Sequence, residues 1–207
     1  MKLYTFDPAP NPKRLAMFMA YKGIELPTQQ ISLMEKEQMS DEYRGINPKL
    51  TVPALQLDSG EVLTEVIGIC TYLEGLYPEK PLLGSNPLQK AQIMSACHEI
   101  FVEGLQAIAD ILRNANPAFA DRALPGPVNC AQIPELVERG HLRLDAFVRA
   151  MDARLADQET VVSGALTQAD IDLYAVVEFM AWVKASVPED CQALQAWHKR
   201  MTAHFAG

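Results

Sequence analysis

The stretch LTVPALQLDSGEVLTEV, residues 50–66, decides how the first third of the chain folds. VPALQL and EVLT have the pattern of two strands, and the three-residue DSG turn between them is typical of a hairpin. The tripeptide TEV then opens a helical pattern. Pro53 lies inside the first strand, although proline has no N–H to donate to a sheet. Two interpretations are open: an edge strand that tolerates proline, or a cis Val52-Pro53 peptide bond.

A cis bond at this point has a functional consequence. It is expected to turn the backbone N–H and C=O of Val52 outward, so that an extended peptide can pair with them in antiparallel fashion. The helix that begins at Glu65 presents unpaired N–H groups and a partial positive charge, which hold a carboxylate. Glu65 itself can capture an ammonium group. Together these features predict a site for a γ-glutamyl tripeptide.

Composition excludes several classes of partner. The 207 residues, 49% hydrophobic and 21% charged, are ordinary for a globular chain of one or two domains. The net charge of −8 argues against nucleic acid or an anionic membrane as the main partner. No apolar stretch of about 18 residues predicts a membrane span, and MKLYTFDP lacks the apolar core of a signal peptide. A cytoplasmic location is expected.

The four cysteines, Cys70, Cys97, Cys130 and Cys191, lie far apart and form no CxxC pair. This spacing excludes a dithiol redox motif and a zinc-ribbon site. We expect Cys70 and Cys97 to be buried free thiols, the compartment to be reducing, and no metal to be bound.

The pattern of secondary structure changes near residue 80. Before it, strand, helix and strand are followed by a short irregular helix, the hairpin and a helix from Glu65 to Leu76. Beyond it every periodic segment is helical: residues 88–114, 132–156, 169–185 and 190–205. We predict an α/β domain at 1–79, a Pro- and Gly-rich linker at 80–87 and an all-helical domain at 88–207.

Several ordered motifs resemble the glutathione S-transferase family. They are KLYTFDPAPNPKRLAMFMAYKGIELP at residues 2–27, NPKLTVPAL at 47–55, SGALTQADIDLYAVVEF at 163–179 and LQAWHKRM at 194–201. The most similar pattern is that of the theta-like bacterial and fungal subclass, whose loop reads Pro-x-Pro-Asn. The resemblance implies a thioredoxin-like N-terminal domain with a cis-proline, an all-helical C-terminal domain that contributes the electrophile site, and a homodimer.

The resemblance also implies how glutathione is held as co-substrate. The backbone of Val52, before the cis-proline, would pair with the cysteinyl part, and Glu65 would bind the γ-glutamyl amine. Val66 stands where the family has a serine that binds the γ-glutamyl carboxylate, so only its N–H can serve. The residues placed in the glutathione site are Asn11, Leu50, Val52, Pro53, Glu65 and Val66.

The loop that would activate the glutathione thiol differs from the family's pattern. The family uses a Tyr, Ser or Cys after the first strand, but the loop DPAPNP has none. The carboxamide of Asn11 can donate to the sulfur and favour the thiolate, helped by the following helix N-terminus. The alternative makes Asn11 a helix cap or a turn residue. Candidate contributors from the helical domain are His98, Asn114 and Asn116.

Two functions are therefore open. One is an enzyme that conjugates glutathione to a small hydrophobic electrophile, or uses glutathione to reduce disulfides or peroxides. The other is a non-catalytic glutathione-transferase-like interaction module with weak or no affinity for glutathione, which Val66 and the loop without a hydroxyl favour.

Overall fold

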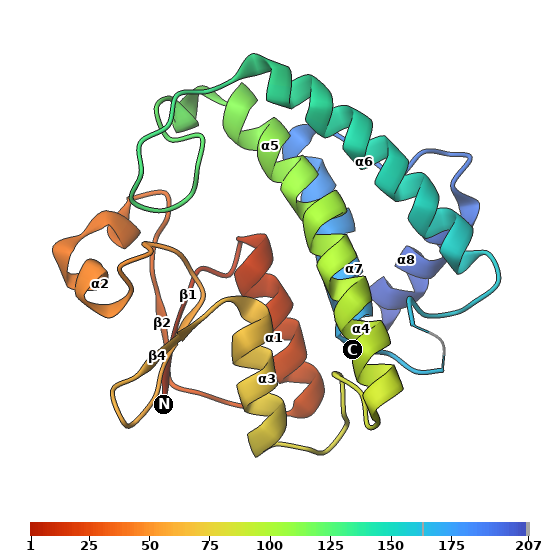
Figure 1. Ribbon diagram of the computed structural model, residues 1–207, viewed down its shortest axis with the longest axis horizontal. Coiled ribbons are helices and arrows are strands. Elements are labelled where there is room, and N and C mark those ends of the chain that lie inside the picture. Colours follow the sequence, from red (N-terminus) through yellow and green to blue (C-terminus); the bar gives the residue numbers. More distant parts are fainter. Residues whose placement is uncertain (163, 206–207) are drawn as a thin grey trace. The chain divides into compact units, whose positions relative to one another are not determined.

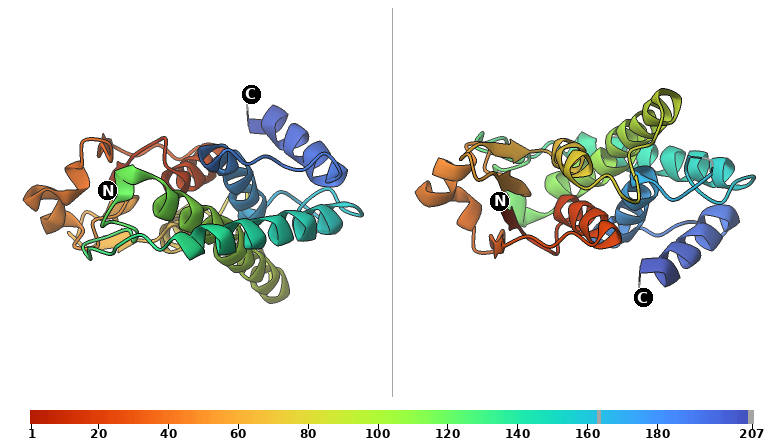
Figure 2. Two further views of the ribbon diagram at one scale, coloured as in Figure 1. Left: turned by 90° about the horizontal axis from the view of Figure 1, so that it is seen from above. Right: turned by 90° about the horizontal axis from the view of Figure 1, so that it is seen from below.

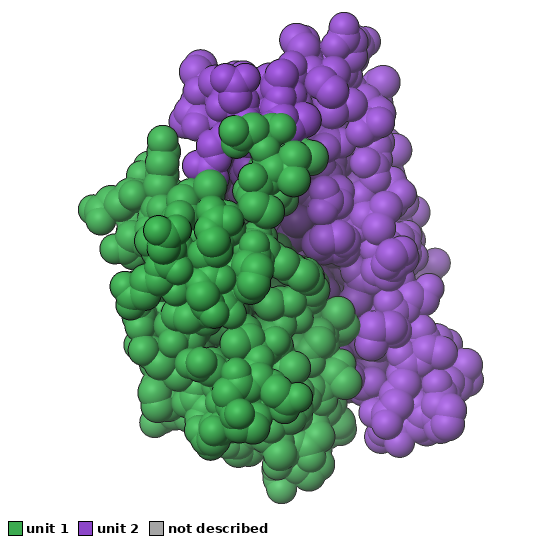
Figure 3. All heavy atoms as spheres, turned by 60° about the vertical axis from the view of Figure 1, so that its left-hand side comes forward, with its two compact units in different colours: residues 1–81, 124–129 green, residues 82–123, 130–207 purple. Residues whose placement is uncertain are grey.

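The computed structural model describes residues 1–162 and 164–205. The chain divides into two compact units (Figure 3): unit 1 comprises residues 1–81 and 124–129, and unit 2 comprises residues 82–123 and 130–207. The division after residue 81 falls within the segment that composition marks as a linker. The grouping of 124–129 with unit 1 is not foreseen by any sequence pattern.

Unit 1 is built on a four-stranded mixed sheet with the strand order β2-β1-β3-β4. The central pair β1 and β3 is antiparallel, β2 is parallel to β1, and β4 is antiparallel to β3. Helices α1 and α3 lie side by side, and α2 lies on the opposite side of the sheet (Figures 1 and 2). The elements are β1 (Lys2–Thr5), α1 (Pro10–Lys22), β2 (Thr28–Gln30), η1 (Glu37–Met39), α2 (Asp41–Ile46), β3 (Ala54–Gln56), β4 (Val62–Thr64) and α3 (Val66–Leu76).

Strand alternation explains how the short strands bury both faces of the sheet. Tyr4 pairs with Ala54 across β1 and β3, and both belong to a buried cluster with Tyr43 of α2. The adjacent pair, Leu3 and Leu55, is also buried and points to the opposite face because side chains alternate along a strand. A sheet that is covered on both sides thus arises from strands of three or four residues.

Every regular element among the described residues of unit 2 is a helix, and the loops between them include an isolated bridge between Arg122 and Cys130. The segment predicted as one helix, 88–114, is interrupted by η2, a stretch of π-helix. Two glycines let η2 and α5 approach α6 closely. A Cβ on Gly104 would lie 2.7 Å from the Phe147 ring, and one on Gly140 would lie 2.9 Å from the carbonyl oxygen of Ala107. The elements are α4 (Pro87–Glu99), η2 (Ile100–Leu105), α5 (Gln106–Ala115), η3 (Pro117–Phe119), α6 (Pro134–Leu155), α7 (Gln168–Phe179), η4 (Met180–Val183) and α8 (Gln192–Phe205).

The buried helix α7 begins with a capping box formed by Thr167 and Asp170. The backbone N–H of Thr167 donates to Oδ2 of Asp170 over 2.9 Å, and the N–H of Val161 donates to Oδ1 over 2.8 Å. Burial raises the pKa of Asp170, while these hydrogen bonds lower it. Asp170 therefore joins the preceding loop to the start of the helix, which is a structural role.

Candidate functional site

The Val52-Pro53 peptide bond is cis. The edge-strand interpretation of the proline is wrong, because β3 lies inside the sheet and begins only at Ala54. Among the residues that the structure describes, no hydrogen bond uses the backbone N–H or C=O of Val52. Unit 1 thus carries an unpaired donor and acceptor directly before β3, as an additional strand requires.

The loop before Val52 is held by side chains of α2 and its C-terminus. The hydroxyl of Tyr43 donates to the carbonyl oxygen of Thr51 over 2.7 Å, and Nδ2 of Asn47 donates to the same oxygen over 2.8 Å. Burial raises the pKa of Tyr43 to about 12, so the phenol remains a donor at neutral pH. Leu50 takes a left-handed conformation with φ 56°. These contacts fix the backbone that leads into Val52.

Helix α3 begins beside this loop with a second unusual backbone conformation. Glu65 is the N-cap residue with φ 66°, and its carbonyl oxygen accepts from Ile69 over 3.1 Å. The N–H groups of Val66 and Ile67 belong to the first turn and have no helical acceptor. Strained non-glycine residues tend to gather at functional sites, and Leu50 and Glu65 are two of them.

The side chains at the start of α3 differ in exposure. The Glu65 side chain is 64% exposed, and its Oε1 lies 3.2 Å from Nζ of Lys49. Val66 is 4% exposed, so its side chain packs inside the unit. Lys49 also donates to Oγ1 of Thr64 over 3.2 Å. The Glu65 carboxylate and the N–H groups of Val66 and Ile67 are therefore polar groups that α3 offers to a ligand here.

Asn11 lies inside α1 and is not its cap. The N-cap residue is Ala9, so the alternative that made Asn11 a helix cap is wrong. Oδ1 of Asn11 accepts from Nη1 of Arg14 over 2.9 Å. Nδ2 of Asn11 has no hydrogen-bond partner within the described part of the chain. The free end of this carboxamide is thus a donor.

The three candidates from the helical domain lie in different surroundings. His98 is an exposed residue on α4. Asn114 is 8% exposed, and both ends of its carboxamide are used: Nδ2 donates to the carbonyl oxygen of Asp110 over 2.8 Å, and Oδ1 accepts from the N–H of Ile133 over 2.9 Å. Oδ1 of Asn116 accepts from the N–H of Ala118 over 2.9 Å and caps η3.

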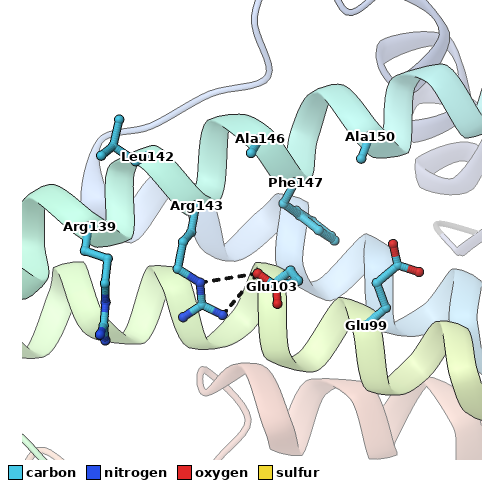
Figure 4. Close-up of a pocket in the computed structure, with 8 residues that line it drawn as sticks. All are labelled: Glu99, Glu103, Arg139, Leu142, Arg143, Ala146, Phe147 and Ala150. Atoms are coloured by element: carbon cyan, nitrogen blue, oxygen red, sulfur yellow. Dashed lines mark hydrogen bonds and ion pairs between the residues drawn. The ribbon is translucent and has the colours of Figure 1, made fainter.

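Unit 2 contains a surface groove of about 360 Å³ between α6 and the segment formed by α4 and η2 (Figure 4). Phe147 and Ala146 contribute apolar surface, and Arg143 pairs with Glu103 over 3.2 Å. Figure 4 shows the side chains of Arg143 and Glu103 pointing toward one another. None of the residues predicted for the site lines this groove.

Within residues 1–162 and 164–205, no group of three or more His, Cys, Asp or Glu side chains is arranged to hold a metal ion. No helix in the same ranges has the length and apolar character needed to cross a bilayer.

Comparison with known proteins decides the family. Residues 9–76 match the glutathione S-transferase N-terminal domain, and residues 115–204 match the C-terminal domain. Glutathione S-transferase 2 of Saccharomyces cerevisiae is 30% identical over 206 residues, which are 97% of this chain and 85% of the yeast protein. The chain belongs to the glutathione S-transferase family.

Other glutathione S-transferase relatives support the same assignment. Maleylacetoacetate isomerase of Pseudomonas aeruginosa is 29% identical over 194 residues, 76% of this chain and 90% of that protein. The crystal structure of a glutathione S-transferase domain-containing protein of Marinobacter aquaeolei superposes with a TM-score of 0.90 at 26% identity, over 98% of both chains. The predicted family, the thioredoxin-like domain and the helical glutathione S-transferase domain are confirmed. The theta-like subclass stays a prediction.

Sequence reasoning missed the residues that hold the candidate site in place. Tyr43 and Asn47 hold the Thr51 carbonyl, and Arg14 holds Asn11. The Asn47-Pro48 dipeptide is a turn signal that marks the loop. Nothing in the periodicity identifies Tyr43 or Arg14 as partners, since both contacts depend on side-chain geometry.

Proposed function

We propose that this glutathione S-transferase is an enzyme that binds glutathione on unit 1 and uses its thiolate as a nucleophile toward a small hydrophobic electrophile. The observation that carries the proposal is the unpaired backbone N–H and C=O of Val52, next to the cis bond to Pro53 and preceding β3. The cysteinyl residue of glutathione pairs with these two groups as a short antiparallel strand.

The γ-glutamyl end of glutathione binds at the start of α3. Its carboxylate accepts from the N–H groups of Val66 and Ile67, where the helix dipole is positive. Its ammonium group binds the carboxylate of Glu65. The ion pair of Glu65 with Lys49 lies on the surface, with both side chains more than half exposed, so it contributes little and does not prevent a second cation from binding.

The sulfur meets Asn11. Nδ2 of Asn11 donates a hydrogen bond to the thiolate, which is stabilised relative to the thiol because the bond goes to the charged form. The proton leaves to solvent. The thiolate then attacks the electrophile: a C–S bond forms, and the leaving group departs with the electron pair of the bond that breaks. Conjugation of this kind needs no protein cysteine.

There are three other candidate functions, and an observation favours two of them. The likeness to maleylacetoacetate isomerase favours a reaction in which the same thiolate adds reversibly. A disulfide or peroxide reductase would start from that thiolate and use a second glutathione, so that glutathione disulfide leaves as the oxidised product. The buried Val66, which offers no hydroxyl, favours a non-catalytic module with weak or no affinity for glutathione.

Calorimetry with glutathione, followed by conjugation assays with an activated aryl halide and by disulfide reduction assays, tests the proposal. We expect measurable binding at millimolar glutathione or below, and turnover that falls at least about tenfold in Asn11→Ala. Asn86→Ala, which removes a carboxamide that caps α4 in unit 2, serves as the control and should keep turnover. Absence of binding heat at millimolar glutathione would contradict the proposal and support the non-catalytic module.

A further inference from the structure

Arg14 is a buried guanidinium one helical turn after Asn11. It is 4% exposed, and its Nη1 lies 2.9 Å from Oδ1 of Asn11. Residues three positions apart lie on the same face of a helix, so this contact follows from the register of α1. A buried charge is stabilised by hydrogen bonds and ion pairs, and one of its hydrogen bonds goes to the residue proposed to contact the sulfur.

The chemistry of the two groups fixes the orientation of the Asn11 carboxamide. A guanidinium only donates hydrogen bonds, whereas a carboxamide has an accepting oxygen and a donating nitrogen. Oδ1 must therefore face Arg14, and Nδ2 is left as the outer end. If the amide turned over, Oδ1 would be presented instead, and a carbonyl oxygen repels a thiolate. The cation also polarises the amide, which makes Nδ2–H a better donor.

We propose that Arg14 is a positioning residue of the thiolate site, which acts through Asn11 by fixing the end of its carboxamide that the glutathione sulfur meets. This inference rests on the proposed function, since it takes Asn11 as the donor to the sulfur. It goes further by explaining how Asn11 can replace the family's Tyr, Ser or Cys. A hydroxyl rotates to serve as donor, whereas a carboxamide must be held in one orientation, and Arg14 holds it.

A double-mutant cycle tests the inference. The thiol pKa of bound glutathione is measured from thiolate ultraviolet absorbance in the wild type, Asn11→Ala, Arg14→Met and the double variant, with glutathione saturation checked by calorimetry. We expect Asn11→Ala to raise the thiol pKa by about 1 unit, which is about a tenfold fall in the thiolate at neutral pH. Arg14→Met should raise it in the same direction, and the double variant should equal Asn11→Ala, because Arg14 acts only through Asn11.

Two controls separate positioning from folding and from charge. Arg44→Met removes an exposed guanidinium of unit 1 and should leave the thiol pKa unchanged. The side-chain amide signals of Asn11, observed by NMR without glutathione, should shift in Arg14→Met, which loss of stability alone does not produce. If Arg14→Met does not fold, Arg14→Lys takes its place in the cycle, and its smaller effect must also vanish in the Asn11→Ala background.

The possible outcomes test the role of Arg14 separately from the proposed role of Asn11. An unchanged thiol pKa in Asn11→Ala overturns the role of Asn11, and with it that of Arg14. If Asn11→Ala raises the thiol pKa and the effects of the two substitutions add in the double variant, the role of Asn11 stands but the inference about Arg14 is overturned. Arg14 would then act on the thiolate directly, through its charge. An unchanged pKa in Arg14→Met, with Asn11→Ala effective, overturns it as well.

Discussion

Val66 is the residue at which the proposed glutathione site departs from the pattern of its family. Val66→Ser restores a hydroxyl at the first position of α3, where it can donate to the γ-glutamyl carboxylate. A hydrogen bond to a charged group contributes roughly 1.5–3 kcal/mol, so the Kd for glutathione should fall about tenfold or more, as calorimetry would measure. Val66→Ala, which removes the same bulk without adding a hydroxyl, is the matched control. Equal affinities of the two variants would rule out this explanation.

Because of Tyr43, the free energy of unfolding should depend on pH in the alkaline range. The unfolded phenol ionises near pH 10, whereas burial raises the pKa of Tyr43 in the folded chain to about 12. Its contribution is therefore fully present below pH 10 and is lost as the pH rises from 10 to 12. Between pH 9 and pH 11, the free energy of unfolding should fall about 1 kcal/mol more in the wild type than in Tyr43→Phe.

Chemical denaturation of both proteins at the two pH values provides the measurement. Tyr43→Phe also lacks the hydrogen bond to the Thr51 carbonyl, so its stability at pH 9 should already be lower by about 1 kcal/mol. Identical pH slopes would show that Tyr43 does not titrate between these limits.

At the scale of single residues, the sequence identifies the groups that carry unusual chemistry but not the groups that hold them. Pro53 stands out because proline is rare within a strand, and Asn11 because the loop offers no other donor. Tyr43 and Arg14 look like an ordinary aromatic and an ordinary cation on two helices. Their roles depend on distances of 2.7 and 2.9 Å that only the folded chain defines.

The contact of α5 with α6 depends on the absence of a side chain at Gly140. In Gly140→Ala the new Cβ would lie 2.6 Å from Cγ1 of Ile111, so the helices must move apart. We expect a loss of about 1–3 kcal/mol in the free energy of unfolding, as measured by chemical denaturation. Gly75→Ala in α3 is the control: nothing lies within 4 Å of its Cβ, and the better helix propensity of alanine should leave stability unchanged or raise it by about 0.5–1 kcal/mol. A Gly140→Ala protein as stable as Gly75→Ala would contradict this account.

At the scale of elements, hydrophobic periodicity predicts the number and order of the main helices and strands well. It fails where the hydrogen-bond pattern changes without a change in periodicity. The apolar pattern of 88–114 continues through η2, so the π-helical stretch is invisible in it. Likewise 169–185 reads as one helix, but α7 ends at Phe179 and is followed by the 3-10 turn η4.

The whole molecule is expected to be a homodimer, as the family resemblance implies. Sedimentation equilibrium or light scattering at micromolar concentration should give twice the 22.9 kDa mass of one chain. A mass of one chain across the micromolar range would contradict this prediction. The measurement is independent of glutathione and of the chemistry at Asn11.

Composition indicates the boundary near residue 80, but it does not indicate that residues 124–129 group with unit 1. The Pro- and Gly-rich linker contains the observed boundary after residue 81. Residues 124–129 could not be assigned, because their grouping rests on a contact rather than on a pattern. A Cβ on Gly126, for example, would lie 3.2 Å from the carbonyl oxygen of Lys49.

The grouping of residues 124–129 with unit 1 limits how the chain can be divided into fragments for expression. Expression of residues 1–81 by themselves would omit the six residues that complete unit 1, and expression of 82–207 would carry those six residues without the surface they contact. Neither fragment therefore coincides with a compact unit of the structure, although a boundary drawn from composition suggests two domains. Fragment complementation with 1–81 and 82–207, supplied together, is the arrangement that provides every residue of unit 1.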